Sequence, residues 1–127
     1  MIIGVTGFYG SGKDTLAEYL TKQGFEHHSL SNEVRKEVLK KNLNLTRENQ
    51  IKIANQIRKI HGSNYFAKRV IEKIKNNKCV VTSIRNEQEL IEFRKFDDFI
   101  LLNIIAPVEE RFDRIKQRKR YGDPKTL

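Results

Sequence analysis

A run of glycines that ends in a lysine, near the amino end, has the spacing needed to hold phosphate groups. Residues 7–13 match the pattern G-x-x-x-x-G-K through Gly7, Gly10, Gly12 and Lys13, with Ser11 between the last two glycines. Glycines let the backbone turn so that successive N–H groups point at phosphate oxygens, and a helix that follows adds its positive dipole end. Lys13 would reach the β- and γ-phosphates of a nucleotide. The alternative is a tight glycine turn with an incidental lysine.

The position after Lys13 departs from the usual pattern. A Ser or Thr is expected there to bind Mg²⁺, but the chain has Asp14, and Thr15 follows one place later. Because Mg²⁺ prefers oxygen ligands, Asp14 and Thr15 are the predicted metal ligands. A dinucleotide-binding loop fits poorly, since Thr15 stands where its third glycine would be.

Alternating strand and helix patterns surround this loop. The spacing of apolar residues predicts strands over 1–6, 25–30, 79–84 and 99–105, and helices over 13–20, 32–41, 47–61, 64–76, 86–95 and from Pro107 onward. In the helix over 47–61, we expect the apolar positions Ile51, Ala54, Ile57 and Ile60 to form the inward face. The order implies a mainly parallel sheet with a helical insertion at about 31–77, and ligands bind at the carboxyl edge of such sheets.

The amino-acid composition indicates the charge of a binding partner but does not identify its class. The 127 residues include 25 Lys and Arg against 16 Asp and Glu, which gives a net charge of +9. Such a surface favours anionic partners, although a solvated lysine-rich surface would look the same. No signal peptide or membrane span is evident, so we expect a cytoplasmic protein without a membrane partner.

The possible metal and redox residues are few. Cys79 is the single cysteine, which excludes an internal disulfide and a zinc site built from cysteines, and we expect it to be buried in a strand. His27 and His28 have no partner at metal-ligand spacing, so structural roles are predicted for them.

Together these features resemble the P-loop nucleoside monophosphate kinase-like proteins, including dephospho-CoA kinase-like and archaeal relatives, and the P-loop domain that precedes some deoxycytidylate deaminases. The sequence Gly-Ser-Gly-Lys-Asp-Thr at 10–15 carries the resemblance, which extends from Ile2 to Pro124. It implies a P-loop NTPase three-layer α/β sandwich over residues 1–127. It also implies that Arg35 and Arg85 bind the phosphate of an acceptor.

The basic segment near the carboxyl end resembles the lid of these kinases. The lid would begin at about 111–127 and contains Arg111, Arg114, Arg118 and Arg120. The resemblance implies that Arg114 and Arg118 contact ATP and that Arg118 stabilises the transferring phosphoryl group. The kinases continue with a further strand and helix that we do not find here, which suggests a longer polypeptide with a further or partner domain after Leu127.

Two acids of the family pattern are replaced. Asn32 stands for an aspartate at the start of the acceptor helix, and Thr82 for an aspartate at the end of the third strand. Transfer to a neutral hydroxyl needs a base, whereas an acceptor phosphate arrives already anionic. The replacements therefore disfavour a dephospho-CoA kinase reaction. Glu33 is the nearby acid that could serve as a base, although a charge at a helix N-terminus is the simpler role.

The hypotheses fall into different classes. The first is a kinase that transfers phosphate from ATP, with Mg²⁺, to a small nucleotide; its catalytic residues would be Lys13, Arg85 and Arg118. The second is a nucleotide-sensing regulatory domain of a longer protein, such as a deoxycytidylate deaminase. Nucleic-acid binding by the basic surface is weaker, because no RNA- or DNA-binding motif is present.

Overall fold

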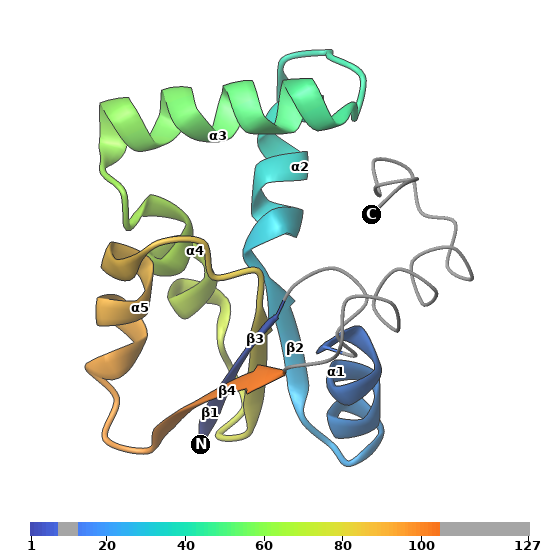
Figure 1. Ribbon diagram of the computed structural model, residues 1–127, viewed down its shortest axis with the longest axis vertical. Helices are drawn as coiled ribbons and strands as arrows, with labels where there is room; N and C mark the ends of the chain where they lie inside the picture. The colour runs from blue at the N-terminus through green and yellow to red at the C-terminus, as the bar shows by residue number, and fades with distance from the viewer. Residues whose placement is uncertain (8–12, 105–127) are drawn as a thin grey trace.

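The fold is a four-stranded parallel sheet between helical layers (Figure 1). The computed structural model describes residues 1–7 and 13–104. The strands β1 (Ile2–Gly7), β2 (Glu26–Ser29), β3 (Cys79–Thr82) and β4 (Phe99–Ile104) lie in the order β2-β3-β1-β4. The helices are α1 (Lys13–Lys22), α2 (Leu30–Lys40), α3 (Arg47–His61), α4 (Tyr65–Lys73) and α5 (Glu87–Arg94). The predicted α/β class with a parallel sheet is confirmed.

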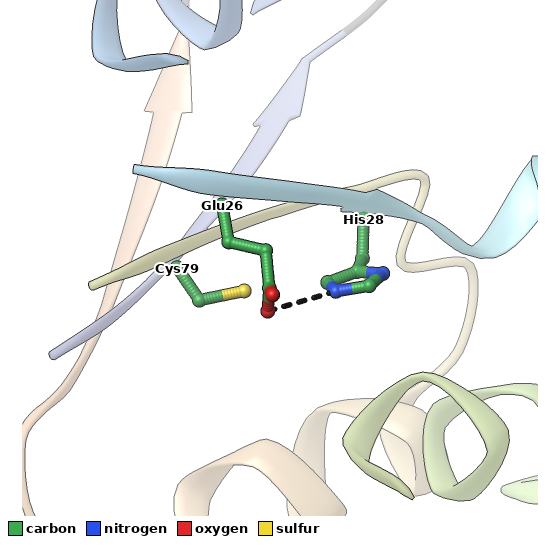
Figure 2. Close-up of side chains that lie close together, drawn as sticks. All are labelled: Glu26, His28 and Cys79. Atoms are coloured by element: carbon green, nitrogen blue, oxygen red, sulfur yellow. Dashed lines mark hydrogen bonds and ion pairs between the residues drawn. The ribbon is translucent and has the colours of Figure 1, made fainter. Parts of the chain in front are cut away.

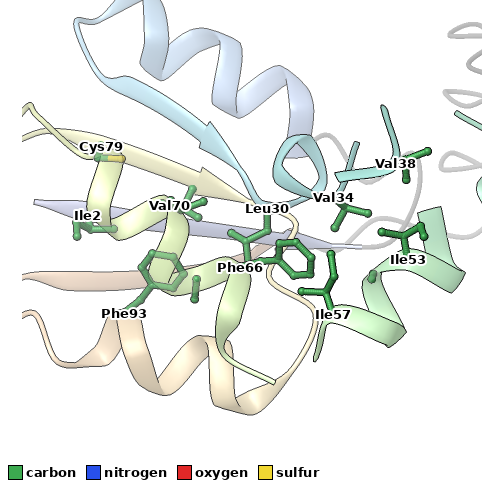
Figure 3. Close-up of a cluster of buried hydrophobic side chains, with 13 residues drawn as sticks. Ile2, Leu30, Val34, Val38, Ile53, Ile57, Phe66, Val70, Cys79 and Phe93 are labelled. Carbon is green, nitrogen blue, oxygen red and sulfur yellow. The ribbon is translucent and has the colours of Figure 1, made fainter. Parts of the chain in front are cut away.

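Two hydrophobic clusters lie on opposite faces of the sheet. On one face, α1 contributes Ala17 to a small cluster with Ile3, Val5 and Val80. On the other face, a larger cluster joins the sheet to α2, α3, α4 and α5 (Figure 3). This second cluster contains Ile2, Leu30, Val34, Val38, Ile53, Ala54, Ile57, Phe66, Ala67, Val70, Cys79, Val81 and Phe93. The helical insertion is therefore fixed to the sheet by burial of apolar surface rather than held beside it as a loose appendage.

The predicted inward face of α3 was wrong in part. Ile51 and Ile60 are 52% and 74% exposed, whereas Ile53 is 2% exposed. The helix packs against α2 and α4 and extends beyond the carboxyl edge of the sheet (Figure 1), so only a narrow stripe of it meets the core. The buried stripe consists of Ile53, Ala54 and Ile57, and the side chain of Ile51 lies outside it.

The ends of several elements have local causes. The Thr46 side chain accepts a hydrogen bond from the Asn49 backbone N–H at 3.1 Å, which caps α3 at its predicted start. The strand β3 ends at Thr82, two residues earlier than predicted, because Ser83 has a φ of 67° that a strand cannot continue. Among the described helices, none has the length and apolar character of a membrane span.

Candidate functional site

The candidate site lies at the carboxyl edge of the sheet, where β1 and β3 are neighbours. The helix α1, which follows β1, covers one face of the sheet, and α5, which follows β3, packs on the other face. In parallel sheets, ligands bind at the point where successive helices lie on opposite faces. Gly7 is the last residue of β1, and Lys13 is the first residue of α1. The glycine-rich segment therefore has a strand before it and a helix after it, as expected.

The structure does not reach the interior of the glycine-rich segment. Gly10, Ser11 and Gly12 lie outside the described residues, as do the side chains of Lys13 and Asp14. Thr15 is exposed in the first turn of α1. The predicted roles of these residues in binding ATP and Mg²⁺ therefore stay predictions.

A cleft of about 290 Å³ opens between the start of α2, α3 and the loop after β3. Three arginines line it, Arg47 and Arg58 from α3 and Arg85 from the loop. The remaining lining residues are Leu30, Ser31, Val34, Gln50, Ile51, Ala54, Asn55 and Ser83. Because this described lining contains no Asp or Glu, its formal charge is positive, and guanidinium groups suit phosphate and carboxylate ligands.

A buried carboxylate, that of Glu89, fixes the backbone of the loop that carries Arg85. Glu89 is fully buried in α5, and its Oε1 accepts hydrogen bonds from the backbone N–H groups of Arg85 at 2.8 Å and Asn86 at 3.3 Å. The Asn86 side chain accepts in turn from the Glu89 backbone N–H, which completes a capping box at the start of α5. Just before Arg85, Ser83 is in the left-handed region and its Oγ accepts from Ser29 Oγ at 3.2 Å. The backbone before and after Arg85 is thus constrained, so the arginine projects from a fixed loop.

The same carboxylate fixes the second arginine of the cleft. Arg58 Nη2 donates to Glu89 Oε2 at 3.0 Å, and the guanidinium carbon lies 5.1 Å from the centre of the Phe66 ring. The Nε of Arg58 is buried without a hydrogen-bond partner among the described residues. Arg58 therefore has its position set by one acid and one aromatic ring while its hydrogen-bonding capacity is not exhausted.

Arg85 also lines a second hollow, of about 310 Å³, between α5 and the ends of β1 and β4. Its other lining residues include Thr6 and Leu101. The predicted acceptor residue Arg85 therefore stands between the three-arginine cleft and the strand that leads into the glycine-rich segment.

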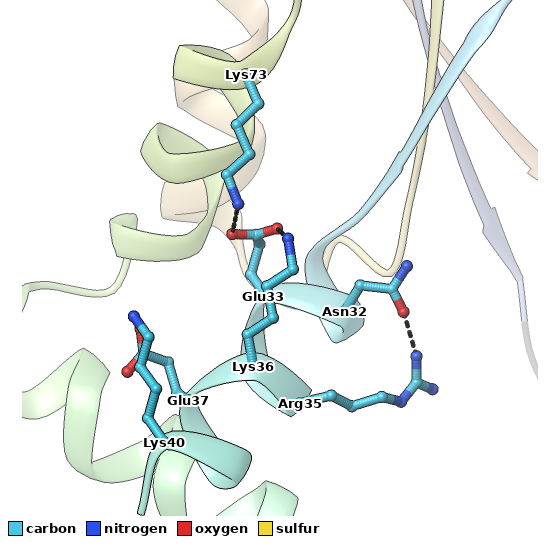
Figure 4. Close-up of polar contacts among 7 residues, drawn as sticks. All are labelled: Asn32, Glu33, Arg35, Lys36, Glu37, Lys40 and Lys73. Atoms are coloured by element: carbon cyan, nitrogen blue, oxygen red, sulfur yellow. Dashed lines mark hydrogen bonds and ion pairs between the residues drawn. The ribbon is translucent and has the colours of Figure 1, made fainter.

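Arg35, the other predicted acceptor residue, occupies a different place. It is exposed on α2, its guanidinium donates to the Asn32 side-chain oxygen (Figure 4), and it is not among the residues that line either hollow. The structure therefore does not bring Arg35 and Arg85 together at one cleft in the described part of the chain.

Glu33, the candidate base, is engaged in ion pairs instead. Its carboxylate lies 2.6 Å from Lys73 Nζ of α4 and 3.3 Å from Lys36 Nζ (Figure 4). Burial alone would raise the pKa of Glu33, but the hydrogen bonds from Lys73 and Lys36 outweigh it and hold that pKa below its usual value. A carboxylate held ionised by two lysines is a poor proton acceptor, so Glu33 joins α2 to α4 rather than acting as a base.

The last residues of the four described strands are not acids; they are Gly7, Ser29, Thr82 and Ile104. Thr82 is buried at 4% exposure, and its Oγ1 lies 3.1 Å from His27 Nε2.

Cys79 is fully buried, as predicted, and burial, together with the nearby Glu26, raises the pKa of its thiol to about 12. A thiol so strongly protonated is not a nucleophile at neutral pH.

Several site residues escaped the sequence reasoning. Arg47 and Arg58 were not singled out, because their approach to the cleft depends on how α3 is turned. Glu89 had a local signal, the Asn-x-x-Glu spacing of a capping box at 86–89. The lid residues Arg111, Arg114, Arg118 and Arg120 lie outside the described residues, so their roles are untested.

Comparison with solved structures defines the class. A protein named TT1252 from Thermus thermophilus aligns with 93% of this chain and 72% of its own at a TM-score of 0.53 and 20% identity. Shikimate kinase from Aquifex aeolicus aligns with 86% of this chain and 62% of its own at a TM-score of 0.51 and 22% identity. An unliganded sugar kinase from Janibacter aligns with 98% of this chain and 70% of its own at a TM-score of 0.51 and 15% identity. The fold is that of the P-loop kinase-like proteins.

Comparison of sequences defines the family. Residues 3–126 match the family model described as an AAA domain. A UPF0200 protein of Thermococcus kodakarensis is 36% identical over 134 residues, which cover 99% of this chain and 72% of the relative. A UPF0200/UPF0201 protein of Archaeoglobus fulgidus is 37% identical over 133 residues, covering 99% of this chain and 41% of the relative. The chain belongs to the UPF0200 family, whose members carry this P-loop kinase-like domain.

Proposed function

We propose that the chain is an ATP-dependent phosphotransferase whose acceptor is a small nucleotide with a phosphate group. The observation that carries the proposal is the cleft lined by Arg47, Arg58 and Arg85, with no Asp or Glu among its described lining residues, at the same sheet edge as the glycine-rich segment. A volume of about 290 Å³ falls near the lower end of the range for small-molecule sites, which starts at about 300 Å³. Arg47 and Arg85 would neutralise the acceptor phosphate, while Arg58, whose charge is balanced by Glu89, would add hydrogen bonds. Gln50 and Asn55 offer hydrogen bonds to a base or sugar.

The proposed reaction needs no base on the protein. An oxygen of the acceptor phosphate forms a bond to the γ-phosphorus of ATP while the bond from that phosphorus to the β–γ bridging oxygen breaks, and ADP leaves. Because the attacking oxygen is already anionic, the replaced acids at Asn32 and Thr82 are no obstacle. The main catalytic task is to hold two polyphosphates together against their repulsion, and the arginines and Lys13 serve that task.

The donor chemistry at the start of α1 suits Mg²⁺. The carboxylate of Asp14 and the hydroxyl of Thr15 are both hard oxygen ligands. When bound with ATP, the ion would neutralise phosphate charge, and Asp14 and Thr15 would hold it.

A nucleotide-sensing domain is the second candidate. The feature that favours it is the state of Thr82, which is buried beside His27 at the position where the kinases have an aspartate. Such a domain would bind the same nucleotides in the same cleft without transferring phosphate.

The test is phosphoryl transfer by the full chain from ATP to the common nucleoside monophosphates and to dephospho-CoA. ATP hydrolysis without an acceptor is the background. The proposal expects ADP formation that depends on one class of monophosphate, with formation of the matching diphosphate. Tight binding of ATP and a monophosphate without any diphosphate would select the sensor. Transfer to dephospho-CoA alone would contradict the proposed acceptor.

A further inference from the structure

Three side chains that can bind metals converge at the amino ends of β2 and β3, away from the arginine cleft (Figure 2). Glu26 and His28 are two residues apart on β2 and therefore share one face of the sheet. The parallel register pairs Glu26 with Cys79, which brings the thiol to the same face. One donor atom from each residue, a carboxylate oxygen, a ring nitrogen and the sulfur, lies within 4.8 Å of the other two.

This donor set fits zinc by type and nearly by distance. Zinc is bound by thiolate, imidazole and carboxylate ligands at about 2.0–2.3 Å in a tetrahedron, so its donor atoms are separated by about 3.3–3.8 Å. His28 Nε2 and Glu26 Oε2 are already 2.9 Å apart, joined by a hydrogen bond. The three donors, all within 4.8 Å of one another, need only small side-chain movements to surround one ion.

A neighbouring backbone N–H orients one of the donors, and part of the cluster is open to water. The backbone N–H of Lys75 donates to Glu26 Oε2 at 3.1 Å, which orients the carboxylate from the turn before β3. The His28 and Glu26 side chains are 19% and 23% exposed, whereas Cys79 is fully buried. Water can therefore reach the histidine and carboxylate side of the cluster and serve as a fourth ligand.

Ordinary structural roles can explain Cys79 by itself and the pair of His28 and Glu26 by itself, but they do not explain why the three side chains meet. A buried thiol can behave as a small apolar side chain, and a histidine beside a carboxylate can be an ordinary ion pair. Neither role requires the sulfur to point at the pair. Figure 2 shows all three side chains directed to one point below the sheet. That convergence is the feature a metal site requires.

We propose that Glu26, His28 and Cys79 form a Zn²⁺ site that joins β2 to β3 at the amino end of the sheet. Binding of the ion through Sγ of Cys79 releases the thiol proton to water, and binding through Nε2 of a neutral His28 imidazole leaves its hydrogen on Nδ1, so the hydrogen bond to Glu26 is replaced by two bonds to the ion. The ion would join two strands and the Lys75 turn, so its role is to stabilise the fold. The proposal does not depend on the phosphotransferase function.

The test is titration of the metal-free, untagged full chain with Co²⁺, followed by competition with Zn²⁺. The thiolate-to-cobalt charge-transfer band reports the sulfur ligand, and a Co²⁺ ion held by oxygen ligands at the start of α1 gives no such band. We expect one equivalent to produce the band and Zn²⁺ to remove it. Added Zn²⁺ should also raise the midpoint of thermal unfolding.

Two variants test the thiol and imidazole ligands, and a third serves as the control. Cys79→Ser should abolish the charge-transfer band, and His28→Asn should weaken Co²⁺ binding at least tenfold. His27→Asn is the matched control, because His27 faces Thr82 on the other side of the same strand, and it should bind like the wild type. If Cys79→Ser does not fold, His28→Asn and the wild-type spectrum decide. Absence of the band in the wild type, or unchanged affinity in His28→Asn, would overturn the proposal.

Discussion

The two ends of the parallel sheet present opposite arrangements of polar groups. At the carboxyl end, Arg47, Arg58 and Arg85 surround a cleft of about 290 Å³. At the amino end, three lone-pair donors from Glu26, His28 and Cys79 converge within 4.8 Å. Cations spread around a volume suit a large anion, whereas lone pairs that meet at a point suit a small cation. If both proposals hold, one sheet separates a site for substrates at its carboxyl end from a site for stability at its amino end.

The largest effect is expected at the glycine-rich segment, which belongs to the carboxyl end alone. Lys13→Ala should lower phosphoryl transfer by at least about 10²–10³-fold, the range for the loss of one preorganised charge-stabilising group. The fold should be retained, because the side chain is expected to face phosphate. Steady-state transfer rates and circular dichroism of the purified full chain measure the two effects. Wild-type transfer by Lys13→Ala would remove the assignment of this end as catalytic.

The next effect concerns the buried carboxylate beneath the arginine cleft. Glu89→Gln keeps an oxygen for the Arg85 backbone but leaves the Arg58 guanidinium, 18% exposed, without its counter-charge. Breaking a buried pair costs about 3–5 kcal/mol, and this partial exposure favours the lower end of that range. Urea unfolding of the variant should show this loss, together with a raised KM for the acceptor.

Glu92→Gln is the matched control on the same helix. Glu92 is nearly as buried, but it bonds Asn64 and the exposed Lys95, whose side chain is 65% exposed. Its loss should cost about 1 kcal/mol or less and leave the acceptor KM unchanged. Equal effects of the two variants would mean that Glu89 has no special role in positioning the cleft.

A smaller effect is expected from Arg85→Lys. A lysine keeps the charge but loses the planar pair of donors, so the acceptor KM should rise about 10–100-fold, the equivalent of one charged hydrogen bond. The KM for ATP should change much less. Arg69→Lys is the matched control, since Arg69 pairs with Glu72 on α4 away from the cleft. A similar rise in both nucleotide KM values of Arg85→Lys would indicate a disturbance of the whole site rather than a loss of acceptor binding.

The smallest effect tests a contact that belongs to neither end. Burial alone would raise the pKa of Glu33, but Lys73 and Lys36 hold it below its usual value. A lowered carboxyl pKa stabilises the fold above the unfolded-state value and loses this contribution as the pH falls through the folded-state value. Glu33→Gln should therefore flatten the loss of stability below about pH 4.5, by about 1 kcal/mol or less, because both lysines are more than one third exposed. Urea unfolding at a series of pH values measures the slope, and an unchanged slope would contradict the ion-pair role.

Much of the fold was predictable because its signals are local. The bounds of α3 follow from Thr46 at its start and Gly62 after its end, and the position of Arg85 follows from the end of an apolar strand. Arg47 and Arg58 were not predictable, because the rotation of α3 is set by packing against α2 and α4. The same uncertainty led to the wrong inward face at Ile51 and Ile60.

The cluster of Glu26, His28 and Cys79 was also not predictable from the sequence, because it depends on how two strands pair. Glu26 lies two residues before His28 on the same strand but was not singled out as a ligand, and a single cysteine excludes a zinc site built from cysteines. The parallel register of β2 and β3 brings in the third donor, Cys79, from far along the chain. Spacing rules detect ligands that share a segment, whereas a sheet can assemble ligands from separate strands.

The central claim is that the arginine cleft binds the phosphate of a nucleotide acceptor while the glycine-rich segment binds ATP. Isothermal titration of the full chain with each of the four ribonucleoside monophosphates and dCMP, compared with the double variant Arg47→Gln/Arg85→Gln, tests it most directly. The account predicts that at least one monophosphate binds the wild type and that the double variant weakens this binding by about 100-fold or more, the sum of two charged contacts, while ATP affinity stays within about threefold. Equal monophosphate affinity in the two proteins would contradict it.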